Sequence, residues 1–140
     1  MFFMLKALIV DDEHKARSIL HHYLVNFIPE IKKVEQAASV DEALSVLPGL
    51  RPDIIFLDVE MPHKNGFDFL TAVTNPVFDV IFTTAYNPYA IQAIRFSALD
   101  YLLKPVDPEE LKAAVQRHLN KRENEEQRQE LYTNLVQNIE

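Results

Sequence analysis

The sequence contains no cysteine, and this absence removes several kinds of chemistry at once. Without a thiol there can be no disulfide, no thiolate nucleophile and no zinc–thiolate site. A reducing cytoplasm is compatible with such a chain, and we expect this protein to be cytoplasmic. No apolar run approaches the roughly 20 residues of a membrane-spanning helix. The apolar start at 1–5 lacks the flanks of a signal peptide, so we expect no direct membrane contact.

Positive charge is also scarce. Lysine and arginine total 14 against 21 aspartates and glutamates, giving a net charge of −7. Proteins that hold DNA mainly through its phosphates need the opposite sign, so we expect no direct DNA binding by this stretch of chain. Internal repeats and Gly/Ser-rich linkers are absent as well. The length of 140 residues, 48% of them hydrophobic, fits one globular domain with a proper core.

Short apolar runs alternate with segments in which apolar residues recur at helical spacing. The run Ile54–Leu57 is continuously apolar, which is typical of a strand buried on both faces of a parallel sheet. Alternating strand and helix signals predict an α/β fold with a doubly wound five-stranded parallel sheet. The expected strands are 5–10, 34–38, 54–57, 80–82 and 101–103, and the expected helices are 16–27, 40–47, 67–73, one starting at Asn87-Pro88, and 108–119.

Local signals place several helix boundaries. Ser39, with Glu42 three residues later, fits a capping box, and Pro48-Gly49 is expected to end that helix. Asp107-Pro108 predicts the start of the last helix. Residues 120–130 contain no apolar side chain, after which Leu131 and later apolar residues return at helical spacing. The tail is therefore either a helical extension or linker, or a solvated or disordered end.

Chemically useful side chains follow the ends of four expected strands. Asp11 and Asp12 follow the first strand, Asp58 the third, Thr84 ends the fourth, and Lys104 follows the fifth. Any one of them could simply cap a helix or solvate a loop. Together at one rim, the carboxylates would repel one another unless a hard cation such as Mg²⁺ compensated them. A carboxylate beside that cation can act as a nucleophile and form an aspartyl phosphate.

The chain resembles the receiver domain of two-component response regulators. Four motifs carry the resemblance in order: Val10-Asp11-Asp12-Glu13, Leu57 to Pro62 with Gly66, Thr84-Ala85, and Tyr101 to Pro105. The resemblance spans residues 4 to about 120 and implies a (βα)₅ flavodoxin-like receiver fold. It implies a receiver domain over 4–120, with 121–140 as a polar helical extension or linker toward an output domain that is not in this sequence.

The resemblance also implies roles for individual residues. Asp58 would accept the phosphoryl group from a sensor histidine kinase or a small acyl phosphate. Mg²⁺ would be held by Asp12, Asp58 and the main-chain carbonyl of Glu60, with Asp11 reaching the metal through water. Thr84 and Lys104 would contact the phosphoryl group. The resemblance further implies that Tyr101 is a switch aromatic and that a cis peptide precedes Pro105.

A narrower resemblance concerns Thr84 to Ala90 and Ala98 to Pro105, which are similar to receivers that precede a LytTR-type DNA-binding domain. Ile94 and Arg95 depart from that subgroup, because phenylalanine and an acid are common there. This leaves partner choice on the fourth helix open. The subgroup implies transcription regulation through an output domain that would supply the DNA contact. For a signalling switch we expect the fourth helix, the fifth strand and the last helix to form the output surface, through which a homodimer could form.

Two other functions compete with this interpretation. Glu60, two residues after Asp58, stands where an aspartate-nucleophile phosphatase carries its general acid, although the chain is short for a substrate pocket. A module that acts without phosphorylation is the other alternative, but nothing in it would need the acidic rim. We expect a signalling module that catalyses its own phosphorylation and dephosphorylation, not an enzyme acting on other substrates. His14 and the adjacent His21-His22 are expected to be surface residues, not metal ligands.

Overall fold

A computed structural model describes residues 4–74, 76–85 and 97–137 of the chain. Its five strands form one sheet in the order β2-β1-β3-β4-β5, and every neighbouring pair is parallel. The strands are β1 Leu5–Val10, β2 Ile31–Ala37, β3 Ile54–Leu57, β4 Asp79–Thr84 and β5 Asp100–Leu103. The order reverses between β1 and β3, so the predicted doubly wound parallel sheet is confirmed. Ligands of such sheets bind at the carboxyl ends of the strands near that reversal.

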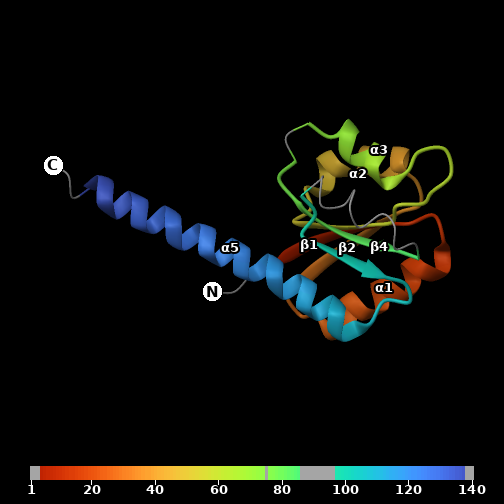
Figure 1. The fold of residues 1–140 in the computed structure, drawn as a ribbon, viewed down its shortest axis with the longest axis horizontal. Helices are drawn as coiled ribbons and strands as arrows, with labels where there is room; N and C mark the ends of the chain where they lie inside the picture. The colour runs from red at the N-terminus through yellow and green to blue at the C-terminus, as the bar shows by residue number, and fades with distance from the viewer. Residues whose placement is uncertain (1–3, 75, 86–96, 138–140) are drawn as a thin grey trace.

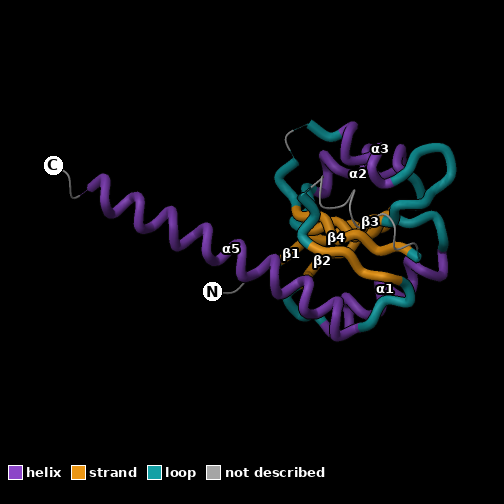
Figure 2. Tube along the Cα trace, in the orientation of Figure 1, coloured by secondary structure: helices purple, strands orange, loops and turns teal. Residues whose placement is uncertain are grey.

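Helices cover both faces of the sheet (Figures 1 and 2). The helices α1 (His14–Phe27) and α5 (Pro108–Gln137) pack on one face, whereas α2 (Val40–Leu50) and α3 (Gly66–Ala72) pack on the other. Alternation along the strands divides the core between the two layers, since successive side chains point to opposite faces. Ile9 and Phe56 pack with the α1 and α5 side chains, whereas Leu8 and Leu57 pack with those of α2 and α3.

Several boundaries differ from the prediction, and two of the differences have a clear physical cause. Strand β2 starts at Ile31, earlier than expected, because Ile31 is buried and pairs with Leu5 while two exposed lysines follow it. Helix α2 does not end at Pro48-Gly49, as predicted, but continues to Leu50. Leu50 is 2% exposed, so core packing holds this last turn even though Pro48 supplies no N–H. Arg51, in a left-handed conformation, then ends the helix and donates its N–H to Leu47 O.

Several helix starts follow from local chemistry. The Ser39 hydroxyl accepts the Glu42 N–H at 3.1 Å, which is half of the predicted capping box. Asn65 and Asp68 form a complete capping box at the start of α3, which the sequence-based prediction missed. Asp107 Oδ1 accepts the Glu109 N–H at 2.8 Å, as its predicted place at the start of α5 requires. The helix expected from Asn87-Pro88 lies outside the described residues.

Helix α5 is much longer than its contact with the domain. Its buried residues end at Leu119, and the helix continues to Gln137 as an arm that leaves the body of the domain (Figure 1). At 1.5 Å per residue, the part beyond Leu119 is about 27 Å long. Over 4–74, 76–85 and 97–137, none of the helices combines the length and apolar character that crossing a bilayer requires.

Candidate phosphoryl-acceptor site

The ends of β1 and β3 bring the predicted acidic residues together. Val10 pairs with Leu57, so the residues that follow them emerge side by side, and the Asp58 N–H donates to Val10 O at 2.9 Å. One carboxylate oxygen from each of Asp11, Asp12 and Asp58 lies within 4.8 Å of the others. Asp11 and Asp58 are each 3% exposed, whereas Asp12 is exposed at the mouth of the site. The expected convergence of three carboxylates on one rim is therefore present.

Lys104 brings the compensating charge from the end of β5. Its Nζ atom lies 2.6 Å from Asp11 Oδ2 and 3.3 Å from Asp58 Oδ2. Burial lowers the pKa of Lys104, but the hydrogen bond and charge of Asp11 and those of Asp58 outweigh it, so its pKa lies above 10.5. The lysine is thus held as a cation between two carboxylates. The peptide between Lys104 and Pro105 is cis, as the resemblance implied.

Asp58 is poorly compensated in spite of this lysine. Burial raises its pKa to about 6, and the charges of Asp11 and Asp12 add to the rise, while Lys104 opposes it. Its Oδ1 atom is buried, and no hydrogen-bond partner for it exists among the described residues. A buried carboxylate oxygen without a partner, beside two further carboxylates, is a donor set that suits a hard divalent cation. The residues present therefore fit Mg²⁺.

Asp11 is fixed from three directions. Its Oδ1 atom accepts the Glu13 N–H at 2.9 Å, and its Oδ2 atom accepts the Lys104 ammonium. Its main-chain carbonyl accepts Arg17 Nη1 at 2.7 Å. The sequence-based prediction missed Arg17. Its position one turn into the helix that follows the acidic pair was the available signal, because a side chain there can reach back to the preceding loop.

Thr84 and Lys104 meet at the ends of β4 and β5. Thr84 is 1% exposed, and its main-chain carbonyl accepts the Lys104 N–H at 2.8 Å. Tyr101 sits further back on β5, where it pairs with Phe82, and the two ring centroids are 6.2 Å apart. The side chain of Tyr101 is half-buried, and that of Glu60 is exposed. Thr84 therefore lies at the strand ends, at the same edge of the sheet as the carboxylates, and Tyr101 lies further from that edge along β5.

Gly66 lets α3 approach the acceptor closely. A Cβ atom built on Gly66 would lie 2.5 Å from Asp58 O and 3.2 Å from Leu57 Cγ, so a larger residue would force the backbone apart. The Gly66 N–H also donates to Val59 O at 2.9 Å. Glycine at this position therefore keeps the start of α3 against the acceptor.

None of the histidines singled out in the sequence belongs to the carboxylate cluster found among the described residues. His14 and His22 are exposed on α1, as expected for surface residues, and His21 between them is half-buried. Tyr86 and Tyr89, at the start of the expected fourth helix, lie outside the described residues.

Comparison with known proteins gives consistent matches. The response regulator receiver domain family matches residues 7–116. An uncharacterized response regulatory protein of Vibrio cholerae is 43% identical over 117 residues, covering 83% of this chain and 49% of that protein. The sensory transduction protein LytT of Bacillus cereus is 39% identical over 125 residues, covering 87% of this chain and 50% of LytT. The chain thus spans about half the length of these two relatives.

Solved structures share the fold. The REC domain of AraT, a response regulator from Geobacillus stearothermophilus, superposes with a TM-score of 0.74 at 30% identity. The match covers 89% of this chain and 99% of that domain. The likeness therefore extends over nearly the whole AraT domain.

Proposed function

This chain belongs to the response regulator receiver domain family, and we propose that its Asp58 accepts a phosphoryl group and thereby switches an output. The observation that carries the proposal is the environment of Asp58. It is buried at the rim with one unpartnered oxygen on one side and the Lys104 ammonium on the other. A buried carboxylate oxygen without a partner costs stability, so its presence at this rim favours a role in chemistry.

Asp11, Asp12, Asp58 and the main-chain carbonyl of Glu60 would hold the metal, Asp11 through a water molecule. Mg²⁺, when bound, would neutralise the charge that gathers on the carboxylates and on the transferring phosphoryl group. The three clustered carboxylates support this assignment. The unpaired Oδ1 atom of Asp58 supports it as well.

The side chains of the site then have separate tasks. An oxygen of Asp58 attacks the phosphorus atom while the bond from phosphorus to the donor breaks. The donor is a phosphohistidine of a sensor histidine kinase or a small acyl phosphate. As negative charge moves from the carboxylate to the phosphoryl oxygens, the Lys104 ammonium contacts those oxygens. The Thr84 hydroxyl donates a hydrogen bond to one of them. The domain would catalyse both this transfer and the later hydrolysis of its own aspartyl phosphate.

Switching would follow from the same contacts. Drawing the Thr84 hydroxyl toward the phosphoryl group would change the space available to Tyr101, which packs against Phe82 on the neighbouring strand. Phosphorylation would then shift an equilibrium between two conformations of this face. The position of the Tyr101 side chain would then depend on whether Asp58 is phosphorylated, and it would change the surface that partners contact.

We assign residues 4–120 to the receiver and 121–140 to an extension that leads toward an output domain. Relatives twice as long support this layout, and the LytT relative favours a LytTR-type DNA-binding output. DNA contact and transcription regulation in the cytoplasm would belong to that output. Receivers would pair through the face that includes β5 and α5. The helix expected on that face between them lies outside the described residues.

The test is the intact mass of the protein after incubation with Mg²⁺ and acetyl phosphate. We expect a gain of one phosphoryl group, lost on chelation of the metal. The matched control is Asp58→Asn, which removes the nucleophile and keeps the shape of the side chain. A gain that persisted in Asp58→Asn would assign the acceptor to another residue.

A second arm separates the alternatives. Sustained hydrolysis of a phosphate ester, lost in Glu60→Gln, would favour the phosphatase. If neither acetyl phosphate nor beryllofluoride with Mg²⁺ changed the mass or the NMR spectrum, the module would act without phosphorylation. Either of these results would overturn the proposal.

A further inference from the structure

An acidic row lies at the edge of the sheet opposite the acceptor site. Asp53 directly precedes β3, Asp79 is the first residue of β4, and Asp100 is the first residue of β5. These strands are neighbours in the sheet. The Asp79 N–H donates to Asp53 O at 3.0 Å, so the backbones at the start of β3 and β4 are joined. The three aspartates therefore line the amino-terminal ends of three adjacent strands.

A basic face of α5 lies against this row. Its members share one side of the helix by their spacing and are Arg117, His118, Lys121 and Arg122. Arg117 pairs with Asp100, and Arg122 Nη1 lies 3.2 Å from Asp53 Oδ1. Between these pairs, both His118 and Lys121 contact Asp79. As α5 advances, its bases thus meet the acids of β5, β4 and β3 in turn.

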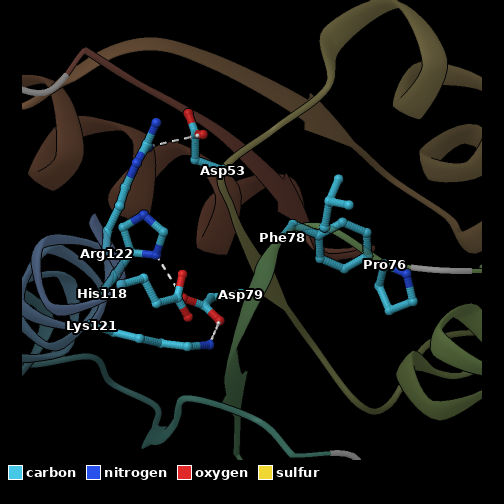
Figure 3. A pocket seen from close by; sticks show the side chains of 9 residues that line it. Asp53, Pro76, Phe78, Asp79, His118, Lys121 and Arg122 are labelled. Atoms are coloured by element: carbon cyan, nitrogen blue, oxygen red, sulfur yellow. Dashed lines mark hydrogen bonds and ion pairs between the residues drawn. The ribbon is translucent and has the colours of Figure 1, made fainter. Parts of the chain in front are cut away.

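The contacts at Asp79 use both of its carboxylate oxygens (Figure 3). His118 Nδ1 donates to Asp79 Oδ2 at 2.7 Å, and Lys121 Nζ donates to Oδ1 at 2.7 Å. The side chains of Asp79 and His118 are only 14% and 9% exposed. Burial raises the pKa of Asp79, but the hydrogen bonds from His118 and Lys121 outweigh it, and the pKa lies below 3.8. Asp79 is therefore ionised and doubly paired.

Asp53 extends the row to a further strand. Its Oδ2 atom accepts the Lys6 N–H of β1 at 2.8 Å, while Oδ1 accepts Arg122. Figure 3 shows Arg122, His118 and Lys121 reaching from the helix toward Asp53 and Asp79. These five side chains also line a cavity of ≈ 400 Å³. The array thus ties one and a half turns of α5 to the starts of β1, β3, β4 and β5.

The position of this array along α5 is informative. Buried side chains of α5 end at Leu119, and from Glu123 to Gln137 every residue except the half-buried Glu126 is exposed. Within the part of the chain that the structure describes, Lys121 and Arg122 are the last α5 residues that form an ion pair with the sheet. The exposed arm therefore begins directly after the point where the helix crosses the acidic row.

We propose that Asp53, Asp79 and Asp100 form an ionic clamp on Arg117, His118, Lys121 and Arg122 that fixes the direction in which α5 leaves the domain. The same three strands lead to the acceptor site: β3 connects Asp53 with Asp58, β4 runs from Asp79 to Thr84, and β5 connects Asp100 with Lys104. The clamp and the acceptor site are thus at opposite ends of these strands. A role of the clamp in signal output rests on the proposed function, whereas the clamp's contacts with α5 do not depend on that function.

The test measures the direction of the arm. Because the chain has no cysteine, Ser45→Cys on α2 and Asn134→Cys on the arm can each carry one spin label. Double electron–electron resonance then gives the distance distribution between domain and arm. The clamp variant is Lys121→Gln with Arg122→Gln, which removes two ion pairs from side chains that are 51% and 39% exposed. The matched control, Arg128→Gln, removes a charge from the same helix beyond the clamp.

We expect a broader distance distribution in the clamp variant than in the parent and in Arg128→Gln. Amide hydrogen exchange at 116–124 should also become about tenfold faster, the factor expected for a loss of about 1.4 kcal/mol in local opening free energy. Asp79→Asn should give the same pattern. Distributions of equal width in all proteins would overturn the clamp, as would equal broadening in Arg128→Gln. Phosphoryl uptake, measured by mass on the same samples, tests the proposed function separately.

Discussion

The Lys104 ammonium lies 2.6 Å from Oδ2 of Asp11, closer than the 3.3 Å that separates it from the acceptor Asp58. The lysine is therefore shared between two buried carboxylates and is nearer to Asp11 than to Asp58, the proposed nucleophile. A cation bound among the carboxylates would neutralise the negative charge of Asp11 in place of Lys104. Lys104 would then be available to a phosphoryl group on Asp58.

Replacing Lys104 by alanine should destabilise the metal-free protein, because Asp11 and Asp58 lose their shared cation. The side chain of Lys104 is 20% exposed, so we expect a loss of about 1–3 kcal/mol in unfolding free energy, between the values for exposed and buried pairs. Urea unfolding with and without Mg²⁺ measures it. The loss in unfolding free energy should be smaller with Mg²⁺ than without it. An equal loss with and without Mg²⁺ would show that the metal does not neutralise the carboxylates that Lys104 contacts. Lys64→Ala, which breaks the exposed pair with Asp41, is the control.

The two glycines offer a matched pair of substitutions. Gly66→Ala should lower the unfolding free energy by about 1–3 kcal/mol, the usual cost of overpacking, because the new Cβ meets Asp58 O at 2.5 Å. Gly49→Ala should be neutral or slightly stabilising, because nothing lies within 4 Å and alanine favours the helix. Thermal unfolding of both variants checks this. Equal melting temperatures for the two variants would show that α3 can move away from Asp58 without a loss of stability.

Asp79 should contribute stability that depends on pH. Its pKa is lower in the folded protein than the ordinary value of 3.8, so the folded state binds the proton less readily than the unfolded chain. The contribution is present above pH 3.8 and is lost as the pH falls through that value toward the folded pKa. Asp79→Asn should therefore lower the urea midpoint at neutral pH, and the gap from the parent should narrow in acid. A gap independent of pH would show that the carboxylate charge is not the source.

Mg²⁺ should stabilise the folded protein by binding it selectively. At a free concentration of about one hundred times Kd, the gain is about 2.7 kcal/mol. Asp12→Asn should reduce this gain, because it removes a carboxylate charge from the mouth of the site while leaving the core untouched. Thermal unfolding over a Mg²⁺ titration measures the effect, with Asp41→Asn as a surface control. An Asp12→Asn protein that gains as much as the parent would exclude Asp12 from the metal site.

Much of the sheet and the rim followed from the chain because local patterns determine them. Continuous apolarity at Ile54–Leu57 marked a buried parallel strand, and the strand-end rule then gathered Asp11, Asp58 and Lys104. Packing overrode a local signal at Pro48, where burial of Leu50 extends the helix.

The acidic row could not be predicted in the same way. Asp53, Asp79 and Asp100 are far from their α5 partners in sequence, with separations up to 69 residues. An aspartate before a strand is common in a turn, and a basic helix face is usually solvated, so neither pattern is specific alone. Their pairing depends on the packing of the buried residues of α5, which brings Arg117 to Arg122 beside the starts of the strands.

Because an aspartate of the clamp stands at one end of β3 and the acceptor stands at the other, the length of this strand is constrained from both sides. Side chains alternate along a strand, so inserting or deleting one residue between Asp53 and Asp58 would turn one of the two carboxylates to the wrong face. The same holds for β4, between Asp79 and Thr84. The lengths of β3 and β4 are therefore fixed by the need to present a carboxylate at one end and a site residue at the other.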